Sequence, residues 1–328
     1  MDLPVPELRS PDEVLVRVRA AALNRLDLWM TAGLPNVRPT FPFIVGSDGA
    51  GEVERVGAGV RRCRPGDRVM INPGLSCGHC ADCVAGEEPL CREFRLLGEH
   101  VPGTAAEYLV IPEGNLAPVP EGMPWAQAAG FSLATLTAWR MLAGRARLRG
   151  GETVLIWGTG GGVALAALQI TQLLGGRAVA TSGTDAKLAT ARALGAALAL
   201  NHSRDDVVGE VRRFTAGRGA DVVVDSVGER TWSDSLRALA RGGRLVVCGA
   251  TTGPSAGFDL RRLFWRQWSI LGSTMGSARE YAEIVRLAHQ GRLWPVVDRV
   301  VPLADGALAY ERMRRGEQTG KLVLEVRP

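Results

Sequence analysis

Four cysteines lie within fifteen residues and could bind one metal ion. Their spacing is Cys-x2-Cys-x2-Cys-x7-Cys in a glycine-containing loop: Cys77, Cys80, Cys83 and Cys91. Four thiolates fill the tetrahedral coordination of a structural zinc ion and leave no position for a substrate. We therefore predict one structural Zn²⁺ rather than disulfides, and interpret Cys63 and Cys248 as buried apolar residues rather than nucleophiles.

A glycine-rich turn could bind a dinucleotide. It follows the apolar run Val154–Trp157 and reads Gly-Thr-Gly-Gly-Gly-Val-Ala over residues 158–164, just before a stretch rich in alanine and leucine. Such a turn lets backbone N–H groups approach a pyrophosphate, and the amino end of the following helix adds partial positive charge. We favour dinucleotide binding over a merely structural turn. The expected contacts are Thr159, Gly160, Gly161, Gly162 and Val163.

The end of the next predicted strand indicates which dinucleotide binds. An NAD site usually carries an acidic residue there, which binds the ribose 2′-hydroxyl. Small and hydroxyl residues follow this strand instead, with a lysine beyond them: Ser182, Gly183, Thr184 and Lys187. This pattern favours NADP(H) over NAD, with Lys187 as an ordinary solvated helix residue as the alternative. Asp185 is interpreted as a helix N-cap.

Further cofactor contacts are expected where the other predicted strands end, because ligands bind at the carboxyl ends of parallel strands. The candidates are His202, Gly249, Ala250, Thr251, Leu271, Gly272 and Ser273. For His202, a solvated loop position is an equally good interpretation.

The pattern of apolar residues differs between the first and the second part of the chain. The first 120 residues predict strands at 14–18, 51–56, 68–71 and 107–111, followed by a helix at 125–142. After residue 152, six predicted strands alternate with helices; the strands are at 154–157, 178–181, 197–200, 221–225, 244–248 and 269–272. The intervening helices are predicted at 163–174, 185–194, 205–215 and 232–240. This order predicts an α/β fold with a doubly wound six-stranded parallel sheet. A helix at 277–290 and a strand at 321–326 return to the first domain.

Composition excludes several other classes. The chain has 328 residues, of which 46% are hydrophobic and 22% charged, as in a folded globular protein. The net charge is +5, but the arginines are scattered among acids, so nucleic acid is a disfavoured partner. Residues 153–176 carry no charge, yet their glycines favour a strand, a turn and a buried helix over a membrane span. The first ten residues lack the apolar stretch of a secretory signal, and we expect a cytoplasmic location.

Taken together, these features resemble the medium-chain dehydrogenase/reductase superfamily, which contains zinc alcohol dehydrogenases and zinc-independent quinone oxidoreductases. Besides the cysteines and the glycine turn, the similar segments are residues 24–33, 46–51, 65–69, 106–108, 136–139, 225–228 and 320–321. The resemblance implies an NAD(P)-dependent oxidoreductase. It implies a GroES-like catalytic domain at 1–133 and 273–328, with a zinc lobe at about 74–95, and a Rossmann cofactor domain at 134–272. It also implies a homodimer or homotetramer that pairs residues 269–272.

The chain departs from the family at the catalytic zinc site. Zinc alcohol dehydrogenases hold a second zinc through a cysteine, a histidine and a later cysteine or acid, and the corresponding positions here are Asn24, Ser47 and Leu133. Asp27 and Asp48 stand at the positions of accessory acids. Two carboxylates without an imidazole or thiolate make a poor zinc site.

Two further residues bear on this loss. Leu26 replaces the hydroxyl residue of the proton relay, and His100 is a nearby alternative ligand that we interpret as a surface or hydrogen-bonded loop residue. Oxidation of an unactivated alcohol then lacks its Lewis acid. Hydride addition to a quinone or an α,β-unsaturated carbonyl needs only hydrogen bonds to the developing oxyanion.

The resemblance therefore implies an NADPH-dependent quinone or enone reductase without a catalytic zinc. Its candidate catalytic residues are Asn24, Asp27, Ser47 and Thr137. Asn24 is expected to donate a hydrogen bond, Asp27 to organise polar groups and Thr137 to lie near the nicotinamide. Ser47 either donates a hydrogen bond or is simply small enough for close packing. The alternatives are a zinc alcohol dehydrogenase with rearranged ligands and a non-catalytic NADP-binding sensor or RNA-binding protein.

The amino end also differs from the family pattern. Members usually carry about two more strands before the segment that here begins at residue 2. Two explanations stay open: the start codon was placed too late, or another element covers the exposed edge of the sheet.

Overall fold

The computed structural model describes residues 3–34, 37 and 40–326. These residues form two compact units. The first comprises the described residues within 1–133 and 276–328, and the second comprises Ala134–Met275. Each unit has its own sheet and its own core.

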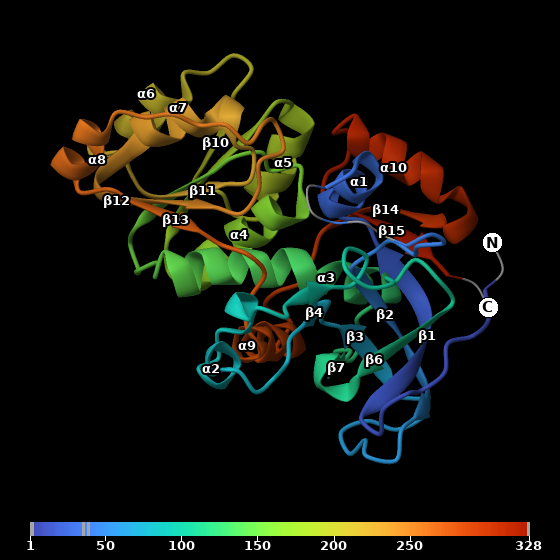
Figure 1. Cartoon of the computed structure of the whole chain (residues 1–328). Helices are drawn as coiled ribbons and strands as arrows, with labels where there is room; N and C mark the ends of the chain where they lie inside the picture. The colour runs from blue at the N-terminus through green and yellow to red at the C-terminus, as the bar shows by residue number, and fades with distance from the viewer. Residues whose placement is uncertain (1–2, 35–36, 38–39, 327–328) are drawn as a thin grey trace. The chain divides into compact units, whose positions relative to one another are not determined.

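The first unit is built on a mixed, mostly antiparallel sheet (Figure 1). Its strands are β1 (Glu13–Ala22), β2 (Asp48–Val56), β3 (Arg68–Ile71), β6 (Tyr108–Pro112), β7 (Leu116–Pro118), β14 (Val297–Pro302) and β15 (Lys321–Glu325). The strand order is β14-β15-β1-β2-β3-β7, and β6 also pairs with β1. The long strand β1 therefore joins the beginning of the chain to its end, through register pairs such as Ala20 with Glu325.

Alternation along β1 explains its place in this sheet. Val14, Val16 and Val18 face a core that also contains Val53, Ile71 and Ile111, among other apolar residues. The intervening Arg17 and Arg19 bind Glu52 of β2 on the other face, at 3.2 and 2.9 Å. Period-two alternation of this kind is typical of a strand with one buried face.

Short helices complete the first unit. They are α1 (Arg25–Ala32), α2 (Ala81–Val84), α9 (Ala278–His289) and α10 (Gly306–Arg314), with a two-stranded ribbon of β4 (Gly74–Leu75) and β5 (Arg95–Leu96). Helix α9 begins at a capping box in which Ser277 and Glu280 each accept a backbone N–H. Helix α3 (Trp125–Trp139) continues into a π-helical turn, Arg140–Arg145, in the second unit.

The second unit is a parallel sheet of six strands between helices (Figure 1). The strands are β8 (Thr153–Ile156), β9 (Arg177–Ser182), β10 (Leu198–Asn201), β11 (Ala220–Asp225), β12 (Leu239–Val247) and β13 (Ser269–Gly272). Their order is β10-β9-β8-β11-β12-β13, so the direction of winding reverses between β8 and β11. The helices are α4 (Gly162–Leu173), α5 (Asp185–Ala193), α6 (Val207–Phe214), α7 (Glu229–Ala238) and α8 (Leu260–Arg266).

Branched apolar side chains hold α6 and α7 to this sheet. Val208 and Val211 of α6 and Leu236 of α7 share one core cluster with Leu155, Val179 and other strand residues. Because parallel strands are buried on both faces, their sequences are continuous apolar runs rather than alternating ones. These runs made the six strands visible in the sequence.

The predicted α/β class and the doubly wound sheet are confirmed. Residues 153–176 form β8, a turn and α4, and among the described residues no helix is long and apolar enough to cross a membrane. The interpretation of Asp185 as an N-cap is wrong. Thr184 is the N-cap of α5, whereas Asp185 is its first helical residue and binds Arg204 in a bidentate ion pair.

Candidate active site

The four cysteine thiols of the loop converge in the first unit. The Sγ atoms of Cys77, Cys80, Cys83 and Cys91 all lie within 4.8 Å of one another. Cys77 Sγ is 3.9 Å from Cys83 Sγ and 3.6 Å from Cys91 Sγ. A tetrahedral zinc ion with Zn–S bonds of about 2.3 Å needs sulfur atoms about 3.8 Å apart. The donor set and its spacing therefore fit a structural zinc ion.

Backbone geometry also prepares this loop for a cation. Hydrogen bonds from the backbone N–H groups of His79 and Cys80 lower the pKa of the Cys77 thiol to about 6. By contrast, burial, aided by Asp225, raises the pKa of the Cys248 thiol to about 12. Of these two thiols, Cys77 is therefore the more readily ionised.

In the second unit, the glycine turn joins β8 to α4 as expected. Gly158 adopts φ +72°, a left-handed conformation that favours glycine. Gly161 is the N-cap of α4, and a Cβ atom built there meets no heavy atom within 4 Å. The space in front of the helix amino end is therefore open to a phosphate group. Thr159 is fully buried and donates to Thr181 O at 2.9 Å, so its side chain anchors the turn to β9.

Basic side chains gather where β9 and β10 end. His202 Nδ1 lies 3.3 Å from Thr181 Oγ1, and a Cβ atom at Gly183 would lie 3.3 Å from His202 Nε2. Burial lowers the pKa of His202, with smaller contributions from the positive charges of Arg230 and Lys187. This corner can accept a negatively charged group, as the ribose 2′-phosphate of NADP(H) would require.

Two acidic residues, Asp185 and Asp205, lie at this corner, and Arg204 pairs with both. Arg204 binds both carboxylate oxygens of Asp185 at 2.9 Å, and Asn201 Nδ2 donates to Asp185 at 3.2 Å. These partners lower the pKa of Asp185, Arg204 making the largest contribution. The negative charge of Asp185 is therefore paired with a neighbouring cation.

The remaining predicted cofactor residues lie at the ends of β12 and β13. Thr251 Oγ1 donates to Ser226 O at 2.8 Å, and Ser273 N donates to Val247 O at 2.9 Å. Thr137, on α3, is buried with its Oγ1 atom 4.0 Å from Met275 Sδ. The roles of these residues stay predictions.

Asp225, at the end of β11, organises the adjacent loop. Its fully buried carboxylate accepts the N–H groups of Val227 and Gly228 at 2.8 and 3.0 Å. It also accepts the hydroxyls of Thr231 and Ser235, both at 2.8 Å. Sequence reasoning placed Asp225 in a family motif but assigned it no role. The structure shows it as the anchor between β11 and α7.

A buried polar cluster lies in the first unit at the positions of the missing zinc ligands. Asp48 is fully buried, and its Oδ1 atom accepts the backbone N–H of Leu133 at 2.7 Å. Its Oδ2 atom accepts Asn24 Nδ2 at 3.0 Å and Lys321 Nζ at 2.8 Å. The Lys321 ammonium also donates to Asn24 Oδ1 at 2.6 Å. Sequence reasoning named Lys321 only as part of a family motif and assigned it no role, because its partners lie far away along the chain.

Ser47 faces away from this cluster. Its hydroxyl is buried and donates to Leu97 O at 2.7 Å. Close backbone contact holds the segment in place, because a Cβ atom at Gly103 would lie only 2.0 Å from Gly46 O. In this arrangement, the hydroxyl hydrogen of Ser47 is used within the protein. Whether Ser47 donates to a substrate or is only small enough for close packing stays a prediction.

Asp27 adds a second buried carboxyl group next to the cluster. Its Oδ2 atom accepts the backbone N–H of Asn24 at 2.8 Å, at the capped start of α1. Burial raises the pKa of Asp27 to about 6, although this hydrogen bond and the positive charge of Lys321 act in the opposite direction. Burial and the neighbouring Asp27 also raise the pKa of Tyr310. Asp27 thus fixes the start of α1, and its predicted role in the substrate cleft stays a prediction.

These residues do not fit a catalytic zinc ion. The side-chain oxygen of Asn24 accepts an ammonium group, Ser47 points elsewhere, and Leu133 is apolar. His100 lies in a hydrogen-bonded loop, with its Nδ1 atom 3.2 Å from Leu96 N, and in the part of the chain that the structure describes it belongs to no cluster of three possible ligands. Among the described residues, the cysteine lobe supplies every cluster of three or more possible metal ligands.

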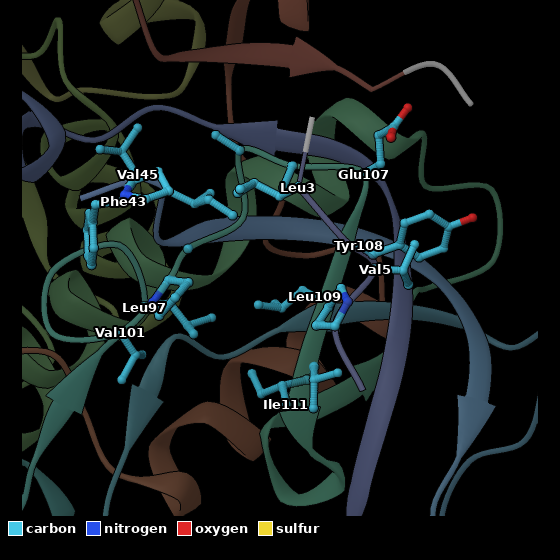
Figure 2. Close-up of a pocket in the computed structure, with 18 of the residues that line it drawn as sticks. Leu3, Val5, Phe43, Val45, Leu97, Val101, Glu107, Tyr108, Leu109 and Ile111 are labelled. Atoms are coloured by element: carbon cyan, nitrogen blue, oxygen red, sulfur yellow. The ribbon is translucent and has the colours of Figure 1, made fainter. Parts of the chain in front are cut away.

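A separate apolar hollow of about 1290 Å³ lies elsewhere in the first unit. Leu109 and Ile111 of β6 and Leu3 and Val5 of the amino-terminal segment line it, together with Phe43 (Figure 2). That segment, residues 3–9, forms no strand beside β6. Since the residues of the polar cluster do not line this hollow, we do not include it in the candidate active site.

Comparison with known proteins agrees with this geometry. Residues 10–121 match the family "Alcohol dehydrogenase GroES-like domain", and residues 162–290 match "Zinc-binding dehydrogenase". A quinone oxidoreductase of Pseudomonas aeruginosa is 33% identical, over 97% of this chain and 93% of the relative. The chain belongs to the medium-chain dehydrogenase/reductase superfamily. A crotonyl-CoA reductase of Streptomyces avermitilis is 30% identical, over 100% of this chain and 82% of the relative.

A solved NAD-dependent alcohol dehydrogenase has the same fold. It is 45% identical with a TM-score of 0.95, over 100% of this chain and 95% of that one. The chain is therefore an NAD(P)-dependent oxidoreductase of the medium-chain dehydrogenase/reductase superfamily, with a GroES-like domain and a Rossmann cofactor domain. The predicted superfamily, fold class and enzyme class are confirmed.

The raised pKa of Asp27 predicts a pH-dependent contribution to stability. Its folded-state value of about 6 exceeds the ordinary 3.8, so its contribution is full below pH 3.8 and lost as the pH rises through 6. The quantity to compare is the free energy of unfolding of Asp27→Asn minus that of the parent. This difference should rise by up to about 3 kcal/mol from pH 4 to pH 7, because only the parent loses the contribution of Asp27. Denaturant unfolding at each pH measures the difference. Asp234→Asn, at an exposed carboxylate, is the control and should change it by less than about 1 kcal/mol. A flat difference for Asp27→Asn would contradict the prediction.

The cysteine lobe predicts the zinc content of the purified protein. The parent should contain one zinc ion per chain, and Cys83→Ser should contain none, because a tetrahedral site loses a buried ligand. Cys248→Ser, which leaves the lobe intact, should retain one. Elemental analysis gives the count. Zinc retained at parental stoichiometry and affinity in Cys83→Ser would show that the ion binds elsewhere.

Proposed function

We propose that this protein is an NADPH-dependent reductase of quinones or α,β-unsaturated carbonyls that works without a catalytic zinc ion. The observation that carries the proposal is the Asp48–Lys321–Asn24 cluster, which stands where zinc alcohol dehydrogenases are expected to hold their catalytic metal. Likeness to a quinone oxidoreductase and a crotonyl-CoA reductase supports the same reaction class.

The first unit contributes a fixed electrostatic environment. Bound NADPH supplies a hydride that can add to an activated C=C bond or a quinone carbonyl. The ammonium group of Lys321 and the carboxamide of Asn24 are preorganised by Asp48, so they need no reorganisation when negative charge develops on a substrate oxygen. Asn24 is expected to donate a hydrogen bond to the substrate carbonyl or to the nicotinamide amide, as predicted from the sequence.

The second unit supplies the contacts that favour NADPH. Gly162 and Val163 lie in the first turn of α4, where the backbone N–H groups can meet a pyrophosphate, whereas the N–H groups of residues 159–161 donate within the turn and to β9. Ser182, Gly183, Thr184 and Lys187 are the residues expected to contact the 2′-phosphate. Support comes from the positive charges of Lys187 and Arg230 near His202, and from Arg204, which pairs with both nearby acids, Asp185 and Asp205. The residues at the ends of β12 and β13 complete the proposed cofactor site. One structural zinc ion in the cysteine lobe and a cytoplasmic location belong to the same proposal.

A zinc-dependent alcohol dehydrogenase with rearranged ligands is the second candidate. The observation in its favour is the 45% identity to a solved NAD-dependent alcohol dehydrogenase. The two functions differ in metal count, since the alcohol dehydrogenase needs a second zinc ion. They also differ in the direction of turnover and in the preferred cofactor.

The test is steady-state NADPH oxidation with a panel of quinones and enals, alongside NADH and alcohols with NADP⁺ or NAD⁺. We expect turnover with NADPH and an activated acceptor, one zinc ion per chain, and negligible alcohol oxidation. Lys187→Ala should raise the KM for NADPH about tenfold and leave the KM for NADH nearly unchanged, because it removes one charge-assisted contact to the 2′-phosphate.

Arg192→Ala, on the same helix, is the control; Arg192 donates to Ala199 O and should not affect either KM. Alcohol oxidation that requires a second zinc ion would favour the second candidate. Tight NADPH binding with no turnover across the panel would instead indicate a nucleotide-binding sensor.

We also propose that two copies pair through β13. It is the edge strand of the six-stranded sheet, and α8, just before it, exposes Leu260, Phe264 and Trp265 to about two thirds of their surface. Exposed apolar patches beside an unpaired edge are typical interaction sites. The resulting assembly is a homodimer or a dimer of dimers.

Sedimentation at several protein concentrations tests this surface. Trp265→Glu should raise the dimer dissociation constant at least about tenfold, because a charge replaces a large apolar side chain. Leu308→Glu, at an equally exposed leucine of α10, should leave the assembly unchanged. A parent that stays monomeric at every concentration would contradict the proposal.

A further inference from the structure

Lys321 is an unusually enclosed cation. It is the first residue of β15, only 3% of its surface is exposed, and its ammonium contacts Asp48 Oδ2 and Asn24 Oδ1. Its aliphatic stem packs against Gly130 of α3: a Cβ atom there would lie 3.2 Å from Lys321 Cβ and Cγ. The absence of a side chain at position 130 therefore gives the lysine its path to the cluster.

The atoms around the ammonium group link the positions where a zinc ion would be held. Asp48 joins Asn24 through its Oδ2 atom and Leu133 through its Oδ1 atom, and Lys321 binds the same Oδ2 atom. A zinc ion held from position 24 would need a ligand atom about 2.0–2.3 Å away. The ammonium nitrogen already lies 2.6 Å from the side-chain oxygen at that position. Two cations cannot share these ligand atoms in a buried site without strong repulsion.

We propose that Lys321 is a positioning residue whose ammonium group takes the place of the second metal ion: it neutralises Asp48, orients Asn24 and excludes a divalent cation. The inference rests on the zinc-free site of the proposed function and adds to the missing ligands a cation that stands in the place of the metal. The charge of the cluster agrees with it. One ammonium balances one buried carboxylate, and the raised pKa of Asp27 disfavours a second negative charge.

A purely structural role makes a different prediction. If the Asp48–Lys321 pair only joined β2 to β15, restoring metal ligands at positions 24, 47 and 133 would restore zinc binding whether or not the lysine is present. If the ammonium excludes the metal, the same ligands bind zinc only after the lysine is removed. Metal uptake therefore separates the two roles.

The experiment uses the full chain with Asn24→Cys, Ser47→His and Leu133→Cys introduced together. This background is compared with and without Lys321→Met, which keeps a side chain of similar length but removes the charge. Zinc per chain is counted, and Co²⁺ absorption reports the ligand geometry. We expect one zinc ion while Lys321 is present and two after Lys321→Met, with Lys321→Arg behaving like lysine. A second zinc ion bound in the presence of Lys321, or no second ion in a folded Lys321→Met variant, would overturn the proposal.

A second measurement needs no new ligands. In the parental background, Lys321→Ala leaves Asp48 buried and unpaired, and its thermal midpoint should fall by about 10 °C. Propylammonium should recover at least half of this loss, whereas sodium at equal ionic strength should not. Arg312→Ala, which breaks the Arg312–Asp298 pair in the same unit, is the control and should show no ammonium-specific recovery.

A Lys321→Ala variant that is as stable as the parent, or one that recovers equally with sodium, would also overturn the proposal. Neither measurement depends on turnover. A protein that lacks quinone or enone reductase activity would therefore still show whether Lys321 excludes the metal.

Discussion

A carboxylate buried in the first unit must be paired, and this requirement shapes the surroundings of Asp48. Its two oxygens accept one backbone N–H, one carboxamide and one ammonium group. Leaving such a group without its cation typically costs about 3–5 kcal/mol. The starts of α1, β2 and β15 and the middle of α3 are therefore tied to one point.

The two units accommodate negative charge in different ways. The second unit meets a phosphate-bearing cofactor with backbone geometry: a left-handed glycine, an open helix amino end and a loop anchored by Asp225. The first unit relies on side-chain charge that is enclosed in the fold. This division agrees with the sequence. Glycine and small residues dominate the turn at residues 158–164, whereas the polar cluster draws single residues from distant segments.

Much of the second unit could be predicted from the sequence because its signals are local. Each buried parallel strand is a continuous apolar run, and the glycine turn lies directly after the first of them. Elements with weak local signals were missed. They include α1, which lacks clear apolar periodicity, α8, whose apolar residues are exposed, and α10, which begins at Gly306.

The same difference applies to the candidate site. The cysteine lobe could be predicted because all four ligands lie within one loop. The absence of catalytic zinc ligands was inferred from the resemblance, by comparing positions 24, 47 and 133 with those of zinc alcohol dehydrogenases. The role of Lys321 could not be predicted. Its hydrogen-bond partners Asp48 and Asn24 lie 273 and 297 positions earlier in the chain, so they leave no local pattern. Asp185 was misassigned for a related reason, since its partner Arg204 comes from the segment after β10.

The pairing of β1 with β15 also constrains how the protein is made. Asp48 is translated 273 residues before the Lys321 ammonium that neutralises it, and β1 likewise precedes its partner strand β15 by most of the chain. The Rossmann unit, by contrast, is continuous in sequence and complete before β15 is synthesised. Assembly of the GroES-like unit must therefore await synthesis of β15, and a nascent chain that still lacks this strand carries an uncompensated charge in an unfinished sheet.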